Sequence, residues 1–264
     1  MEYAQARIQS RFGERPSRAS WLRLEGVRET GSFMEAANRT GLQRWIAGLD
    51  ERSPWHRVEL ALRERLRGAI RETARWMPSA WRDAFLWTLH LVDLPALAGI
   101  ARGEAVPSWM HDDPVMHFYL DGDASRRPSG ALDNAHRLLL QSASLDAVKP
   151  QARGAWGVDA SMLAEWFKLW KRTWPANRPA ESEGAAEMAR QFAAHLSGFE
   201  SCTTPDRANA LRAAWEDELR RSFRRGALLP VAGFAFLALT ALDLERLRAM
   251  LAERMLIAHQ EDRP

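Results

Sequence analysis

The stretch SPWHRVELALRERLRGAIRETARWM, residues 53–77, decides the fold class, because its apolar residues recur with the period of an α-helix. Arg and Glu fill the positions between them. On a helix the apolar set forms one stripe, made of Val58, Ala61, Leu62, Leu66, Ala69, Ile70 and Ala74. We expect Ser53, which precedes Pro54, to cap this helix and the charged residues to occupy its other side.

Helix-favouring composition extends over most of the chain. Ala, Leu, Arg, Glu and Trp dominate, Val and Ile are few, and period-two alternation is hard to find. We therefore predict an all-α fold. With 264 residues, 46% of them apolar and 27% charged, the chain is long enough for one large helical body or several small packed units.

Two polar stretches divide the predicted helices, one over residues 104–130 after Gly103 and one over residues 175–184. We predict a multi-helical chain with an N-terminal helical unit over 1–104, a loop or linker over 105–130, a middle helical unit over 131–200 and a C-terminal helical unit over 201–264. The alternative is one continuous body. Within these units we expect Ser17 to cap one helix and either Thr204 or Asp206 to cap another.

Charge and cysteine usage narrow the classes of function. The formal net charge is only +3, and acids are interleaved with arginines, so the sequence lacks the long basic stripe of a direct nucleic-acid partner. Cys202 is the only cysteine, which excludes an intramolecular disulfide and any multi-cysteine metal site. The opening residues carry charge where a signal peptide needs an apolar stretch, so we predict a cytoplasmic protein.

A weak internal repeat links two parts of the chain about 150 residues apart. LHLVDLPALAGI, residues 89–100, is similar to LTALDLERLRAM, residues 239–250, and ALRERLRGAIRE from Ala61 is similar to ALRAAWEDELRR from Ala210. The shared frame is a charged amphipathic helix, a proline, an apolar helix and then Asp-Leu-x-x-Leu. Because each Asp follows one predicted helix and precedes another, we expect Asp93 and Asp243 to be helix N-caps.

These motifs resemble those of the V/A-type ATPase C subunit, which is called subunit d in eukaryotes. That family begins with a Tyr-Ala-x-x-Asn/Ala-Arg helix; Tyr3 and Ala4 stand at the corresponding positions here, and Arg7 stands one residue before the position of the signature's Arg. Its all-helical units repeat an apolar helix that runs into Asp-x-x-Asn-Leu. That second motif is matched by Asp93 with Leu97 and by Asp243 with Leu247, whereas Ala96 and Arg246 replace the family's Asn. The resemblance covers about residues 1–30, 55–103 and 208–256.

The resemblance implies a mechanical role. Members of the family form a socket of helices that sits on the rotating membrane ring and receives the central stalk. This chain would then be a non-catalytic coupling or assembly subunit of a proton- or sodium-translocating rotary ATPase, with no catalytic residue and no cofactor. Its partners would be the membrane rotor ring and the central stalk, at the cytoplasmic face of the inner membrane. An unrelated all-helical protein-interaction adaptor is the alternative.

One cluster of metal-ligand types stands in WMHDDPVMHFYLDGD, residues 109–123. The candidates for a metal are His111, Asp112 and His117, with Asp113, Asp121 and Asp123 nearby. Pro114 breaks the helix that would align the two histidines, so we expect a loop without a metal. A helical metal-dependent phosphohydrolase of the HD type, using His90, His111 with Asp112, and Asp133, is a further and less favoured alternative.

The segment WFKLWKRTW, residues 166–174, places Trp166, Trp170 and Trp174 at four-residue spacing with basic residues between them. Such a stripe lies on one side of a helix, and we expect it to pack in the core. A protein interface is the second interpretation. Stacking of nucleic-acid bases on these rings is the third.

Sixteen residues without charge, Ala227–Leu242, raise the question of a membrane-spanning helix. As a helix they would extend about 24 Å, short of the hydrocarbon thickness of about 30 Å. Their counterpart in the repeat carries Arg82, Asp83 and His90, which a spanning helix would not be expected to hold. We therefore predict a helix buried inside the protein, with membrane contact only through a protein partner.

Overall fold

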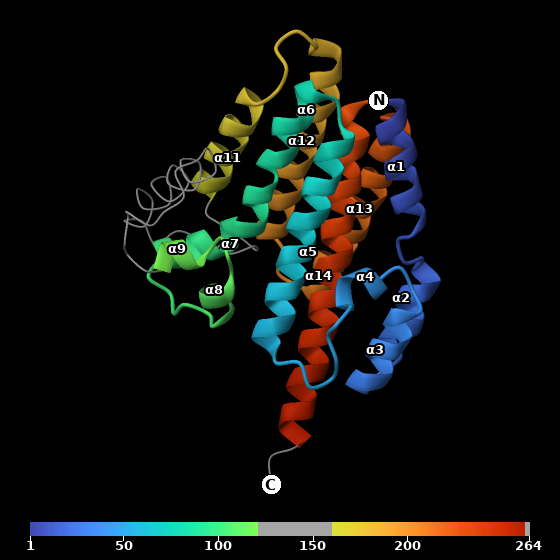
Figure 1. Ribbon diagram of the computed structural model, residues 1–264, viewed down its shortest axis with the longest axis vertical. Coiled ribbons are helices and arrows are strands. Elements are labelled where there is room, and N and C mark those ends of the chain that lie inside the picture. Colours follow the sequence, from blue (N-terminus) through green and yellow to red (C-terminus); the bar gives the residue numbers. More distant parts are fainter. Residues whose placement is uncertain (121–159, 262–264) are drawn as a thin grey trace.

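The computed structural model describes residues 1–120 and 160–261, and every regular element in these two ranges is a helix (Figure 1). The all-α prediction is therefore confirmed for the described residues. The first part of the predicted middle unit, the end of the predicted loop, and Asp121, Asp123 and Asp133 lie outside them. The helices before residue 120 are α1 (Glu2–Gly13), α2 (Arg18–Glu25), α3 (Thr30–Asn38), α4 (Gln43–Ile46), α5 (Trp55–Trp76), α6 (Ser79–Trp87), α7 (Leu89–Ala101), α8 (Trp109–Asp112) and α9 (His117–Leu120).

The second described range contains four long helices, and the last of them organises the molecule. These are α11 (Ala160–Arg172), α12 (Pro179–Glu200), α13 (Pro205–Arg225) and α14 (Pro230–Glu261). Helix α14 contacts α1, α3, α5, α12 and α13, and α5 in turn contacts α1, α4, α6, α7 and α8. Figure 1 shows α5 and α14 running along the long axis of the molecule, with the other helices around them. The earliest and latest parts of the sequence therefore lie side by side.

From Pro230 onward the uncharged stretch forms the first half of α14 and is buried, as predicted, whereas Ala227, Leu228 and Leu229 precede the helix and are exposed. Every residue from Val231 to Leu237 is buried. The ring of Phe234 stacks on that of Phe85 with centroids 3.9 Å apart, and Trp170 meets it edge-on at 5.1 Å. A Cβ at Gly233 would lie 2.5 Å from Met77 Cε and 2.7 Å from the Phe85 ring, so this close approach of α14 requires glycine. The uncharged sequence is thus explained by packing.

The core is shared by segments that the sequence assigns to different units. One cluster of buried side chains includes Ile8, Phe85, Trp170 and Leu239, and so draws on all three predicted helical units. A second cluster joins α2, α3 and α4 to the first half of α5 and the second half of α14. No described break in the core marks the predicted boundary at residue 201, because α12, α13 and α14 contact one another.

The capping predictions at Ser17, Thr204 and Gly103 are confirmed, and the one at Ser53 is wrong. The Ser17 side chain accepts from the Ser20 backbone N–H at the start of α2, and Thr204 does the same for Arg207 at the start of α13. Gly103 follows α7 with a φ of 69°. Ser53 is not the cap of α5: the N-cap is Pro54, and the Ser53 hydroxyl bonds Asp50 instead.

Two helix boundaries also differ from the prediction. Helix α12 begins at Pro179, inside the stretch expected to be a linker, because proline is well suited to the first position of a helix. The apolar helix after Pro78 is interrupted at Thr88, whose hydroxyl donates to the Phe85 carbonyl. Across α6 and α7, residues 79–101 are long and apolar enough to cross a membrane, and 18 consecutive residues among them have a mean hydropathy of 1.5. Since 61% of those 18 residues are buried inside the protein, core packing accounts for their apolar character.

Candidate functional site

The two aspartates of the repeat are not helix N-caps, which corrects the sequence-based prediction. Asp93 lies inside α7, whose N-cap is Thr88, and Asp243 lies inside α14. Both are buried, with 2% and 6% of the residue exposed. Each helix continues through its aspartate, and each carboxylate binds an arginine side chain.

The first of these sites, here called the Arg67 cluster, consists of Arg67, Asp93 and Asp113. Arg67 projects from α5 and donates through Nη2 to Asp93 Oδ1 and through Nη1 to Asp113 Oδ2, the latter at 2.8 Å. The three side chains are 3%, 3% and 0% exposed. Burial opposes the charge on Arg67, but the two carboxylates outweigh it and raise the pKa of the guanidinium. This cluster joins α5, α7 and the turn after α8.

The second site, the Arg15 cluster, consists of Arg15, Asp243 and Glu216. Arg15 follows α1 and donates to both oxygens of Asp243, from Nε at 2.6 Å and from Nη2 at 3.0 Å. Its Nη2 also lies 3.7 Å from Glu216 Oε1 on α13. Burial raises the pKa of the Asp243 carboxyl, and Arg15 opposes this effect. The cluster joins the end of α1 to α13 and α14.

The aspartates of the two clusters are equivalent residues of the repeat, but the arginines that pair with them come from non-equivalent positions. In the alignment that pairs Ala61 with Ala210, the position of Arg67 on α5 corresponds to Glu216 on α13. The second unit therefore has an acid where the first has its arginine. Arg15 supplies the missing guanidinium from 228 residues earlier in the chain.

Sequence reasoning missed a buried charged row on α5 formed by Glu59, Arg63 and Arg67. All three are at most 7% exposed. Arg63 donates from Nε to Glu59 Oε1 at 2.7 Å and from Nη1 to the Val92 carbonyl at 2.6 Å. Arg248 of α14 lies 2.8 Å from the other Glu59 oxygen. The sequence did contain a signal that Arg63 and Arg67 are buried. Residues seven apart lie on the same side of an α-helix, and Ile70 and Ala74 of the apolar stripe come seven residues after these two arginines.

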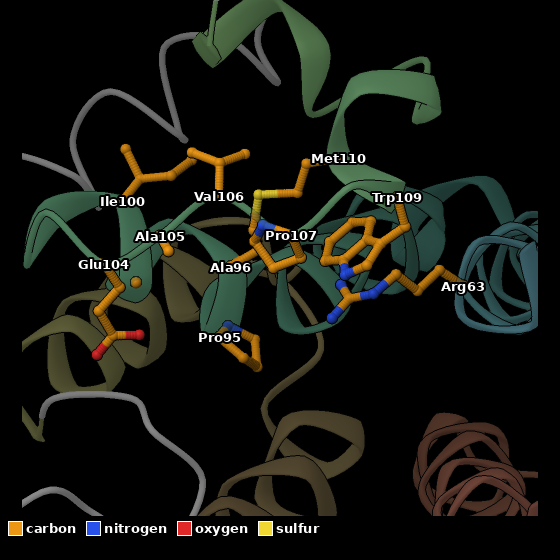
Figure 2. A pocket seen from close by; sticks show the side chains of 11 residues that line it. Arg63, Pro95, Ala96, Ile100, Glu104, Ala105, Val106, Pro107, Trp109 and Met110 are labelled. Atoms are coloured by element: carbon orange, nitrogen blue, oxygen red, sulfur yellow. The ribbon is translucent and has the colours of Figure 1, made fainter. Parts of the chain in front are cut away.

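A cavity of about 210 Å³ opens beside this row, between α7 and the segment that leads into α8 (Figure 2). Figure 2 shows the Arg63 guanidinium against the Trp109 ring, and the two are 4.0 Å apart. Burial lowers the pKa of Arg63, partly offset by Glu59. The cavity is smaller than most small-molecule sites, and its cation is already held by Glu59 and Val92. The other lining residues are Pro95, Ala96, Gly99, Ile100, Glu104, Ala105, Val106, Pro107 and Met110.

The tryptophan stripe packs in the core, so the interpretation of Trp166 and Trp170 as an interface is wrong. Both are 2% exposed, and their rings stack with centroids 5.2 Å apart. Trp170 Nε1 donates to the Ala84 carbonyl of α6 at 3.0 Å. Trp174 is half-buried and meets Trp170 edge-on at 4.9 Å. The apolar side of α11 is thus occupied by α6 and α14.

The metal candidates do not converge in the part of the chain that the structure describes. His111 and Asp112 are exposed on α8, and His117 Nδ1 lies 3.0 Å from the Asp113 carbonyl oxygen. Within residues 1–120 and 160–261, no group of three or more His, Cys, Asp and Glu could hold a metal ion. Asp113 has a structural role instead, since its carboxylate binds Arg67 and accepts from the backbone N–H groups of Val115 and Met116.

Two residues of the HD-type alternative, His90 and His111, differ in their exposure to solvent. His90 is buried in α7 with its ring 4.5 Å from that of Trp87, whereas His111 is exposed. Asp133 lies outside the described residues.

Comparisons with protein-family models, with curated proteins and with solved structures found no match. The function therefore has to be argued from the arrangement of the chain's own residues.

Proposed function

We propose that this protein is a non-catalytic coupling or assembly subunit of a rotary proton- or sodium-translocating ATPase, as its resemblance to the V/A-type C subunit implies. The observation that carries the proposal is the repeated helical unit. Helices α5 to α7 and helices α13 to α14 each place a buried aspartate at the matching position, and each aspartate binds an arginine. The shared sequence pattern thus coincides with a shared interaction.

A mechanical role favours long helices that are tied together at several levels. Helix α14 has 32 residues and would extend about 48 Å. Along this length it contacts five other helices, and Arg15 and Arg248 connect it to the chain before α2 and to α5. Buried ion pairs are directional, so they resist sliding of one helix along another better than apolar contacts alone.

The direct test is reconstitution with the predicted partners. The full chain, carrying an affinity tag, is co-produced with the proteolipid ring and central-stalk subunits encoded in the same genome, and is purified in mild detergent. We expect the chain, ring and stalk to elute together in a fixed ratio by size exclusion and native mass spectrometry. Separate elution of a folded chain and an assembled ring would contradict the proposal.

A genetic test separates coupling from simple binding. Deleting the gene should leave ATP hydrolysis by the catalytic head while abolishing ion translocation by membrane vesicles. Wild-type protein should restore translocation, and so should Arg190→Ala, because Arg190 is an exposed residue of α12 paired only with its helix neighbour Glu187 among the described residues. A deletion that leaves translocation intact, with the chain instead cross-linked to an unrelated protein, would favour the adaptor alternative.

A further inference from the structure

The turn between α13 and α14 exposes two consecutive leucines. Leu228 is 51% exposed and Leu229 is 39% exposed, directly before residues 230–237, the longest run of buried residues in the described ranges. Leu228 also has a φ of 64°, and it is the one residue other than glycine with a positive φ in the described ranges. An exposed leucine therefore occupies a backbone conformation that normally selects glycine.

Two backbone hydrogen bonds and close packing at Gly226 hold the turn that contains Leu228. The Leu229 backbone N–H donates to the Gly226 carbonyl at 2.9 Å, and the Leu228 N–H donates to Oε1 of the buried Gln5 at 3.0 Å. Gly226 packs so closely that a Cβ there would overlap Val231 Cγ1. Backbone strain of this kind costs free energy, and where it persists it tends to coincide with functional sites. A glycine in place of Leu228 would avoid the strain, so the leucine side chain itself is the feature to explain.

Basic residues stand beside the exposed leucines. The last turn of α13 carries Arg224 and Arg225, both exposed. Among the described residues neither has a carboxylate within ion-pair distance, whereas Arg220 and Arg221, one turn earlier, bind Glu216 and Glu218. Tyr3, 66% exposed, lies in the first turn of α1, and Figure 1 shows the N-terminus at the same end of the molecule as the start of α14.

We propose that this end of the molecule, defined by Leu228, Leu229, Arg224 and Arg225, docks directly on an anionic lipid surface. Charge complementarity favours it, because two unpaired guanidinium groups attract anionic headgroups while the leucines enter the acyl boundary. A protein partner fits less well, since a stable protein interface buries about 800 Å² on each side, more than two leucines and two arginines offer. The docking surface does not depend on the rotary-ATPase proposal, and it departs from the expectation that membrane contact occurs only through a protein.

The test uses the full chain and sedimentation with large vesicles. One vesicle type is phosphatidylcholine alone, and the other is phosphatidylcholine mixed with phosphatidylglycerol. We expect the protein to sediment with the mixed vesicles and to remain in solution with phosphatidylcholine alone. We also expect binding to weaken as salt rises, since the arginine contribution is screened.

Leu228→Gly is the decisive variant because it removes the side chain and the backbone strain together. It should bind anionic vesicles about tenfold or more weakly while its thermal midpoint stays at or near that of the wild type. Arg224→Gln with Arg225→Gln should weaken binding by about tenfold at low salt and by less at high salt. Two controls should bind normally: Leu256→Ala, which removes another exposed leucine, and Arg39→Gln with Arg52→Gln, which removes the same charge elsewhere.

Three results would overturn the lipid assignment. The first is wild-type protein that does not sediment with anionic vesicles. The second is equal binding by the wild type and Leu228→Gly. The third is a complex with a purified protein partner, formed without lipid and lost in Leu228→Gly, which would assign the leucines to a protein interface.

Discussion

The Arg67 cluster and the Arg15 cluster keep a buried aspartate at the same place in two helical units, yet they obtain the neutralising cation differently. In the first unit the arginine stands on the neighbouring helix of the same unit, and its side chain is 3% exposed. In the second it comes from the segment after α1 and is 10% exposed, with Glu216 27% exposed. The comparison indicates that a repeated unit must retain a guanidinium for its buried carboxylate, while the residue that supplies it is free to change.

The largest effect is expected when the more deeply buried cluster loses its cation. Arg67→Met leaves Asp93 and Asp113 buried without a cation and should lower the free energy of unfolding by about 3–5 kcal/mol. Urea denaturation at neutral pH measures this loss. Arg71→Met, at an exposed position on the same helix, should change it by no more than about 0.5 kcal/mol. A loss below about 1 kcal/mol for Arg67→Met would mean that this cluster stabilises the fold no more than an exposed ion pair does.

The Arg15 cluster should lose less stability when its arginine is removed, and a second substitution should restore part of that loss. Arg15→Met should cost about 2–4 kcal/mol, less than Arg67→Met, because Glu216 can turn to solvent. Adding Glu216→Arg would place the cation on α13, as Arg67 is placed on α5. We expect the double variant to regain about 1 kcal/mol in urea denaturation. If Glu216→Arg makes the Arg15→Met protein less stable, the two units do not share an equivalent arrangement.

Glycines in the two units should respond differently to an added methyl group. Gly233→Ala should destabilise by about 1–3 kcal/mol, because its Cβ would meet Met77 and the stacked Phe85 ring. Gly99→Ala in α7 is the matched control, since its nearest neighbour is the flexible Glu104 carboxylate at 3.2 Å. The control should be neutral or more stable by up to about 1 kcal/mol in the same thermal or urea measurement. Equal losses for the two variants would show that α14 is not more tightly packed than α7.

The smallest effect is expected from pH, and it should act where α12 packs against α13 of the second unit. His195 of α12 stacks on Trp215 of α13, and burial, followed by the charge of Arg212, lowers its pKa. The unfolded chain then binds more protons than the folded one just below the ordinary value of about 6.5, so stability falls as pH decreases through this window. Thermal midpoints between about pH 5 and 8 measure the slope. In His195→Phe the decrease should be shallower; an unchanged slope would assign it to other groups.

Sequence patterns predicted the helix bounds and helix caps that depend only on residues close by in the chain. The apolar period from Val58 to Ala74 placed α5 within three residues of its observed ends, and Ser17 and Thr204 cap helices because capping needs only the following turn. The partners of the two aspartates are distant in sequence: Asp93 binds Arg67, 26 residues earlier, and Asp243 binds Arg15, so their roles could not be found from neighbouring residues. Arginines were expected on the outer side of α5, and only their partners in space explain why Arg63 and Arg67 are buried. The rotary-ATPase role and its partners remain proposals.

The link between Arg15 and Asp243 also affects the order of events during synthesis. Helix α1 packs against α5 and α14, and its end is fixed by a carboxylate that the ribosome adds 228 residues later. The units that emerge first can pair α5 with α6 and α7, since Arg67, Asp93 and Asp113 are all present early. Part of the apolar side of the first helix, by contrast, stays uncovered until the last helix has been made.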